Sequence, residues 1–434
     1  MPTLRTFLTC AVLLLLSVFP SRADETPKTE VYAKDVDFLL TELEQKAGGL
    51  FAVKGIDWTA VAKQFREEVK TVASDADHVK LCARLLARLQ DGHASLAEVK
   101  VPMPDEAKGR RFTGPRVHLG VQGERVFVRA AFGSALSQGI SIGAVVVKID
   151  GLAARAWLDQ RVAKMSDEQG FSTPGAALYA ACHWGLADWE GTKITFELEQ
   201  DGQTKSVEII RNGGPNYAPF GPVFPPKDLK QIGRQSYGLT ATGFAYIHLR
   251  DVPATLPEQL DTMLADIATA PGLILDMRAN GGGGCDHAAV FGRFVPAGQP
   301  WRQYPSAGAH PFAGPMVVIV DPGVRSAGET IAGQFKEDGR AYMIGEGPTA
   351  GMSSQKAVLA APSGMFSVRF SVASNKGRFN GGRGIEGLGV PPQEVLAYDP
   401  AELAKGIDTQ IHRAEELLKA GLPKDRVPFE KKRP

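Results

Sequence analysis

The chain has 434 residues, 44% hydrophobic and 22% charged, which at ~150 residues per domain suggests two or three domains and excludes wholesale disorder. Lysine and arginine exceed aspartate and glutamate by 49 − 48 = +1, and this near-neutral balance argues against a nucleic-acid-binding protein. The four cysteines are too few for a disulfide scaffold: Cys10, Cys82, Cys182 and Cys285. None of them has the spacing of a metal-binding motif, so the sequence indicates no structural zinc site. No metal or other cofactor is expected.

Residues 1–23 are predicted to be a signal peptide. Arg5 precedes the apolar stretch Phe7–Phe19, and Ser21-Arg22-Ala23 offers small residues where a signal peptidase cleaves. An uncleaved anchor is the alternative, although the stretch is short for a membrane span of about 20 residues. We expect export to the periplasm or the exterior, with no membrane span in the mature chain.

Residues 30–100 are predicted to form a helical region, because apolar residues recur at spacings near three and four. Asp57 is a predicted N-cap of the second helix. A third helix over about residues 75–89 is expected to end at Asp91-Gly92-His93, where Gly92 can adopt a positive φ.

Residues 115–211 have a β-type pattern instead. Short strands are expected at 117–121, 126–128 and 144–149, and a hairpin is expected from 192–199 and 206–210. A polar, alanine-rich insertion at about 152–188 is predicted to be helical. Residues 212–238 are rich in glycine, proline and polar residues and are predicted to be a linker.

From residue 239 to about 400, strands alternate with helices, which predicts an α/β layered domain. Residues 401–434 are expected to give a final helix, over about 401–418, and a tail. The predicted fold class is therefore α/β within an α+β multidomain chain. The expected elements of the layered domain are strands at 244–249, 273–277, 316–320 and 341–344 and helices at 257–269, from 286, and at 326–337.

Ser326 lies between an apolar strand and a helix. Free N–H groups and the helix dipole at that position can stabilise an oxyanion, but on this motif alone a plain N-cap serine is the favoured interpretation. The glycine run 281–284 follows a strand and allows close backbone approach to a ligand. A phosphate loop is excluded because no Lys-Ser/Thr follows, and a turn without function is the alternative.

Two further polar residues are weak candidates on local grounds. His93 follows a helix stop, where a histidine is usually structural, and Glu386 lies in a glycine-flanked loop, where a glutamate is usually solvated. Cys285 and His287, close to the glycine run, are interpreted as packing residues.

As an ordered set, these segments resemble the C-terminal processing (tail-specific) protease family. They are Asp91-Gly92-His93, LILDMRANGGG at 273–283, Ser326-Ala327-Gly328-Glu329 and IEGLGVPP at 385–392. The resemblance covers about residues 30–400. It implies a helical N-terminal region, a PDZ-like domain at 115–211 and a crotonase-like α/β core at 239–400. It also implies serine-type peptidase activity on peptide or protein substrates, which the PDZ-like domain would recognise through their C-termini.

Within that family, the branch with a Ser–Lys dyad has its lysine after a PTAG segment, four residues before a glutamine. Here Gly351 stands four residues before Gln355, Met352 follows PTAG, and Lys356 lies beyond Gln355. The tricorn-like branch instead uses a histidine and a glutamate at positions that match His93 and Glu386. The resemblance therefore implies a Ser326–His93–Glu386 triad.

In this triad His93 would be the general base, and Glu386 would orient His93 and raise its pKa. The oxyanion donors would be backbone N–H groups of Ala327 and of Gly281 or Gly282. Glu329 would support the helix start.

Substrate binding is assigned to two places. Arg325 is expected to attract a substrate carboxylate, and the alternative is that it is simply a solvated arginine. Leu119-Gly120-Val121 is expected to lie at the peptide groove. Two alternatives remain open: a non-catalytic peptide- or lipid-binding protein on the same fold, and a scaffold that uses only its PDZ-like region. The three matched triad residues argue against the first of these, because a binding protein has no need of all three.

Overall fold

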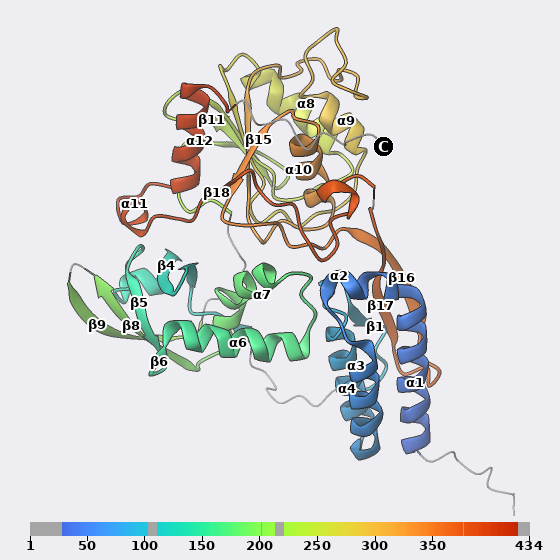
Figure 1. The fold of residues 1–434 in the computed structure, drawn as a ribbon. Coiled ribbons are helices and arrows are strands. Elements are labelled where there is room, and N and C mark those ends of the chain that lie inside the picture. The colour runs from blue at the N-terminus through green and yellow to red at the C-terminus, as the bar shows by residue number, and fades with distance from the viewer. Residues whose placement is uncertain (1–27, 103–110, 201, 213–220, 376, 424–434) are drawn as a thin grey trace, which may run out of the picture.

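A computed structural model describes residues 28–102, 111–200, 202–212, 221–375 and 377–423. The predicted signal peptide, residues 1–23, lies outside them. In Figure 1 an α/β part lies above a β-rich part with two helices and a group of N-terminal helices. Among the described helices, none has the length and apolarity needed to cross a bilayer.

The N-terminal part consists of four helices, α1 (Lys28–Ala47), α2 (Phe51–Lys54), α3 (Trp58–Glu68) and α4 (Asp75–Ala87). Asp57 caps α3, as predicted, because its side chain accepts a hydrogen bond from the Ala60 N–H. After α4 the positive φ falls at Gln90 (45°) and not at Gly92, so that expectation is wrong.

A hairpin that belongs in sequence to the predicted α/β domain packs on these N-terminal helices. Strands β16 (Ser354–Ala360) and β17 (Ser367–Ser374) pair with each other, and β17 also pairs with β1 (Ser95–Ala97). Val368 and Phe370 on β17 are buried in one cluster with residues of α1 and α4. The apolar face of the hairpin is therefore covered by the N-terminal helices rather than by the α/β core.

The β-rich part has an antiparallel sheet with the order β3-β4-β5-β8-β9. The predicted insertion is helical and forms α6 (Ala154–Glu168) and α7 (Pro174–Ala181), which pack against this sheet. The strands are β3 (Val117–Gln122), β4 (Arg125–Ala131), β5 (Val145–Ile149), β8 (Lys193–Gln200) and β9 (Gln203–Ile210).

The α/β part is built on a seven-stranded sheet in which β12 to β15 and β18 are parallel. Helices α8 (Leu256–Ile267), α9 (His287–Gly292) and α10 (Ala327–Glu337) cover one face, and α12 (Thr409–Ala420) covers the other (Figure 1). The parallel strands are β12 (Ala245–His248), β13 (Leu273–Asp276), β14 (Met316–Val320), β15 (Tyr342–Gly345) and β18 (Glu394–Val395).

Two expectations for this part need correction. The predicted linker carries β10 (Lys230–Ile232) and β11 (Gln235–Leu239), which extend the sheet by antiparallel pairing. The single helix expected over 401–418 is split into α11 (Pro400–Ala404) and α12, and Gly406 lies between them with a φ of 77°.

A buried ionic network joins the β-rich part to the α/β part. Arg129 on β4 donates hydrogen bonds to Glu346 Oε1 at 2.9 Å and to the Tyr398 hydroxyl at 2.8 Å. Arg278, also buried, donates to Asp408 Oδ1 at 2.9 Å. Leaving one partner of a buried pair without its counter-charge is costly, so the contacts of Arg129 fix the two parts to each other, and the Arg278–Asp408 pair braces the α/β side.

Candidate active site

Ser326 lies on the turn between β14 and α10 in an unfavourable backbone conformation. Its φ of 58° and ψ of −128° are rare for a residue other than glycine. A strained strand-to-helix turn of this kind exposes a nucleophile in other hydrolases. The Ser326 N–H donates to Glu329 Oε2 at 3.0 Å, and the Arg325 N–H donates to Asn280 O at 3.0 Å. These two bonds hold the turn.

Glu329 is fully buried and organises the surroundings of Ser326. Besides the Ser326 N–H it accepts hydrogen bonds from Thr349 Oγ1 (2.6 Å), Gly351 N (2.7 Å) and Met352 N (2.8 Å). Burial raises the pKa of Glu329 to about 7, although the four donors act in the opposite direction. Its contacts agree with the expected role in supporting the helix start.

The glycine run lies directly against Ser326. A Cβ added at Gly282, whose φ is +79°, would lie 2.7 Å from Ser326 Cβ and 2.9 Å from Arg325 O. However, the Gly281 N–H donates to Arg250 O, and the Gly282 N–H donates to Asn280 Oδ1, both at 2.9 Å. In this structure neither N–H is available to an oxyanion, which contradicts the prediction for these two glycines.

Ala327 fits the predicted oxyanion donor better. It is the first residue of α10, where an N–H has no partner within the helix. The dipole of α10 also favours negative charge at this end.

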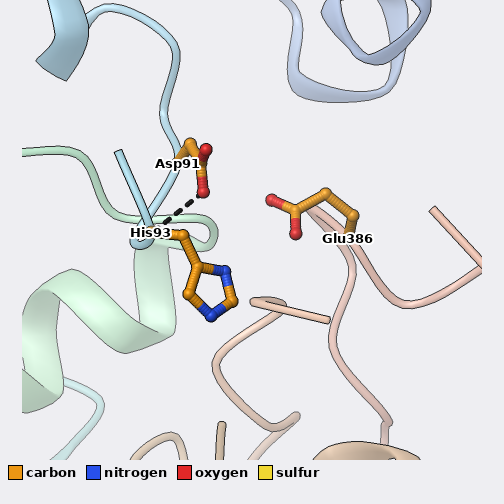
Figure 2. Close-up of side chains that lie close together, drawn as sticks. All are labelled: Asp91, His93 and Glu386. Atoms are coloured by element: carbon orange, nitrogen blue, oxygen red, sulfur yellow. Dashed lines mark hydrogen bonds between the residues drawn. The ribbon is translucent and has the colours of Figure 1, made fainter. Parts of the chain in front are cut away.

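His93 and Glu386 lie close together on loops from opposite ends of the chain, with Asp91 beside them (Figure 2). One side-chain N or O atom from each of the three lies within 4.8 Å of the others. His93 Nδ1 and Glu386 Oε2 are both buried, and neither has a hydrogen-bond partner in the described part of the chain. Buried polar atoms rarely stay unpaired, so these two are suited to pair directly or through one intervening polar group.

Met352 connects the His93 loop to the Ser326 turn. A Cβ added at Gly92 would lie 2.5 Å from Met352 Sδ, so the two segments are in contact. The Met352 N–H shares Glu329 Oε2 with the Ser326 N–H. The structure thus brings the Ser326 and His93 segments, 233 residues apart (326 − 93), to one place.

The pKa of His93 is lowered to about 4, first by burial and then by the positive charge of Lys356. Arg369 and Arg325 act in the same direction, and Asp91 opposes them. These effects lower the pKa of His93 overall, and the rise expected from pairing with Glu386 stays a prediction. Burial also lowers the pKa of Lys356, so this lysine stays the rival general base.

The Asp91–His93–Glu386 group is poorly suited to a metal ion. Asp91 already accepts hydrogen bonds from the His93 N–H (2.9 Å), the Ser371 N–H (2.7 Å) and Ser371 Oγ (3.0 Å). Glu386 Oε1 is occupied by a lysine ammonium and a serine hydroxyl. Only two ligand atoms are left, fewer than a structural or catalytic site of this kind needs.

The three cysteines in the described part of the chain, Cys82, Cys182 and Cys285, form no disulfide. Cys285 packs against the core, and burial raises its pKa to about 11, which fits a packing role.

A cavity of about 500 Å³ opens at Arg325, the residue before Ser326, between the α6–α7 insertion and the α/β part. Arg325 lines it, as does Gly92 beside His93. The rest of the wall is mixed. Its apolar residues include Met165, Phe171, Ala176, Ala350 and Met352, and its other charged residues are Arg161, Lys164, Glu168 and Asp188. Sequence reasoning missed this cavity, because most of its wall comes from the insertion.

The predicted peptide groove at Leu119-Gly120-Val121 is wrong. These residues lie on β3, an edge strand, but the Leu119 N–H already donates to Cys182 O at 2.9 Å. The Leu119 side chain is buried in the core of the β-rich part, and Val121 packs against that core. The segment after α7 thus occupies the edge at the point where an added peptide strand would bind.

Comparison with known proteins agrees with this geometry. Residues 243–396 match the model of peptidase family S41. Over 202 residues the chain is 27% identical to the tricorn protease of Thermoplasma volcanium, covering 43% of this chain and 18% of that protein. The chain thus spans less than a fifth of that relative's length.

Solved structures show the same fold. Mature CPAF complexed with lactacystin superposes with a TM-score of 0.67 at 13% identity, over 90% of this chain and 98% of that chain. A putative peptidase from Parabacteroides merdae gives 0.51 at 16% identity, over 90% and 99%. The predicted α/β fold class is confirmed by these structures, and residues 243–396 are similar to peptidase family S41.

Proposed function

We propose that this protein is an exported serine-type peptidase in which Ser326 is the nucleophile and His93 the general base. One observation carries the proposal: His93 Nδ1 and Glu386 Oε2 are both buried and unpaired among the described residues, and Met352 links the His93 loop to the strained strand-to-helix turn of Ser326. The match of residues 243–396 to the model of peptidase family S41 supports the reaction class.

The reaction follows from this arrangement. With Nδ1 directed to Glu386, Nε2 of His93 is left to accept the Ser326 proton as Oγ attacks a peptide carbonyl. The Ala327 N–H stabilises the oxyanion. The protonated His93 then gives its proton to the leaving amine, and water hydrolyses the acyl-enzyme with His93 again acting as base.

The cavity at Arg325 supports a peptide substrate with an apolar side chain. Its apolar residues remove such a side chain from water, and Arg325 adds a positive charge that attracts a carboxylate. Because the β3 edge is occupied at Leu119, we assign substrate recognition to this cavity and not to β-strand addition in the PDZ-like region.

The test is hydrolysis of a fluorogenic peptide library by the wild type and by Ser326→Ala, His93→Ala and Lys356→Met. Loss of general-base assistance costs about 10²–10⁴-fold, so His93→Ala should fall in or beyond that range while Lys356→Met stays active. An active His93→Ala variant with an inactive Lys356→Met variant would move the base to the lysine. A wild type that binds peptides or lipids without hydrolysing any of the library would favour the non-catalytic alternative.

Export rests on the N-terminal sequence alone, namely Arg5, the apolar stretch Phe7–Phe19 and Ser21-Arg22-Ala23. Mass spectrometry of protein from its native host should find an N-terminus near Asp24. Finding Met1 there would contradict this part of the proposal.

A further inference from the structure

A buried lysine contacts the acid of the proposed triad. Lys54, the last residue of α2, places Nζ 2.9 Å from Glu386 Oε1, and the two side chains are only 2% and 0% exposed. Nζ also donates to Leu89 O at 3.3 Å. A lysine this buried is rare, because removing an ammonium from water costs free energy that only a paired charge and hydrogen bonds offset.

The position of Lys54 ties together the two loops that carry the triad partners of Ser326. Leu89 lies four residues before His93, so its carbonyl belongs to the segment that leads into the His93 loop. On the other side, a Cβ added at Gly387 would lie 3.1 Å from Lys54 Cγ, so the lysine stem packs against the Glu386 loop. One side chain thus contacts both loops.

The ammonium also selects which oxygen of Glu386 is left over. Lys54 Nζ and Ser172 Oγ both donate to Oε1, at 2.9 and 3.1 Å. Oε2 has no hydrogen-bond partner in the described part of the chain and lies with the unpaired Nδ1 of His93 in the same buried group. The contacts on Oε1 therefore fix the carboxylate with its second oxygen free for the histidine.

We propose that Lys54 is a positioning residue of this active site, which keeps Glu386 ionised and aimed at His93 while cancelling most of its negative charge. The inference rests on the proposed peptidase function. It makes the N-terminal helical part a contributor to the catalytic centre.

The charges around the His93–Glu386 pair give this role a measurable consequence. Positive charge comes from Lys54 on α2, Lys356 on β16, Arg369 on β17 and Arg325 beside Ser326, whereas Asp91 is the other negative group. In this field Glu386 can orient the imidazole without holding a proton on it, and burial lowers the pKa of His93 to about 4.

Removing the Lys54 charge should make the pair take up a proton more easily. Either Glu386 becomes protonated, because burial already raises its pKa and Lys54 opposes that rise, or the freed carboxylate holds an imidazolium at His93. Both events block the base, and both occur at a higher pH than in the wild type. The acid limb of kcat/KM should therefore move upward, by about one pH unit or more.

The experiment measures kcat/KM against pH with a small chromogenic ester for the wild type, Lys54→Met and Lys54→Arg, with circular dichroism to establish folding. Lys54→Met should lose at least ~10-fold in kcat at neutral pH and show the raised acid limb, and Lys54→Arg should restore the position of that limb. Lys46→Met, which removes a half-exposed lysine of α1, is the control and should behave as wild type. A folded Lys54→Met with wild-type kcat and acid limb would overturn the inference.

A double-mutant cycle covers the case in which Lys54→Met does not fold. Lys54→Met combined with Glu386→Gln leaves no unpaired buried charge. If Lys54 acts through Glu386, adding Lys54→Met to Glu386→Gln should change neither kcat nor the acid limb further. A further loss of kcat in that background would show that Lys54 acts elsewhere and would refute the inference. An inactive wild type would instead contradict the proposed function itself.

Discussion

The pH dependence of catalysis is the most distinctive consequence of the site. Burial and the charge of Lys356 lower the pKa of His93 from 6.5 to about 4, so the acid limb of kcat/KM should lie near pH 4. At pH 5.5 about 97% of His93 would then be neutral, compared with about 9% for a histidine with its ordinary pKa. The enzyme should therefore keep roughly tenfold more activity at pH 5.5 than an unperturbed histidine base allows.

The perturbation that tests this reasoning is Lys356→Met. Removing the cation should raise the His93 pKa and move the acid limb to higher pH, with little change in the plateau. The assay is kcat/KM for a small ester between pH 3.5 and 9, with unfolding followed at each pH so that acid denaturation is not mistaken for titration. A wild-type acid limb near pH 6.5, or a limb that Lys356→Met does not move, would refute the electrostatic argument.

Three further results are expected. Gly282→Ala should lower kcat at least ~10-fold and stability by about 1–3 kcal/mol, because the new Cβ would lie 2.7 Å from Ser326 Cβ at a φ of +79°. Gly284→Ala is the control, because its Cβ would meet nothing within 4 Å, and it should change neither the kinetics nor the melting temperature. Glu329→Gln should cost about 1–3 kcal/mol in urea unfolding, since an amide N–H would face backbone donors. Because folding raises the Glu329 pKa from 4.5 to about 7, its contribution to wild-type stability should be full below pH 4.5 and lost as the pH rises to about 7, and a variant that keeps this dependence would contradict the assignment. Because the β3 edge is occupied at Leu119, a free C-terminus distant from the scissile bond should not matter. The cleavage rates of such peptides and of their C-terminal amides should agree within about twofold. A strong preference for the free acid would restore the PDZ-like groove.

Local sequence patterns were sufficient to place the proposed nucleophile at a strand–helix junction. The apolar run that forms β14 and the amphipathic pattern of α10 put Ser326 at the junction of a strand and a helix, and the structure has these elements at Met316–Val320 and Ala327–Glu337. The ordered set of short motifs then connected Ser326 to His93 and Glu386, which local evidence alone did not single out. The structure places these two residues in one group with Asp91, in which His93 is half-buried and the two acids are buried.

Contacts between distant segments could not be read from the sequence. Lys54 looks like an ordinary surface lysine at the end of a short helix, yet it is buried against a loop 332 residues away. The glycines at 281 and 282 look like free donors, but Arg250 O and the Asn280 side chain take their N–H groups. The lowered His93 pKa depends on cations from β16 and β17, whose packing on the N-terminal helices no local pattern indicates.

The central claim, an activated Ser326, is tested most directly by labelling with a fluorophosphonate probe followed by peptide mass spectrometry. The account predicts a single adduct on Ser326 in the wild type, none in Ser326→Ala, and much slower labelling in His93→Ala. Wild-type protein that is folded and remains unlabelled, or that carries the adduct on another residue, would contradict it.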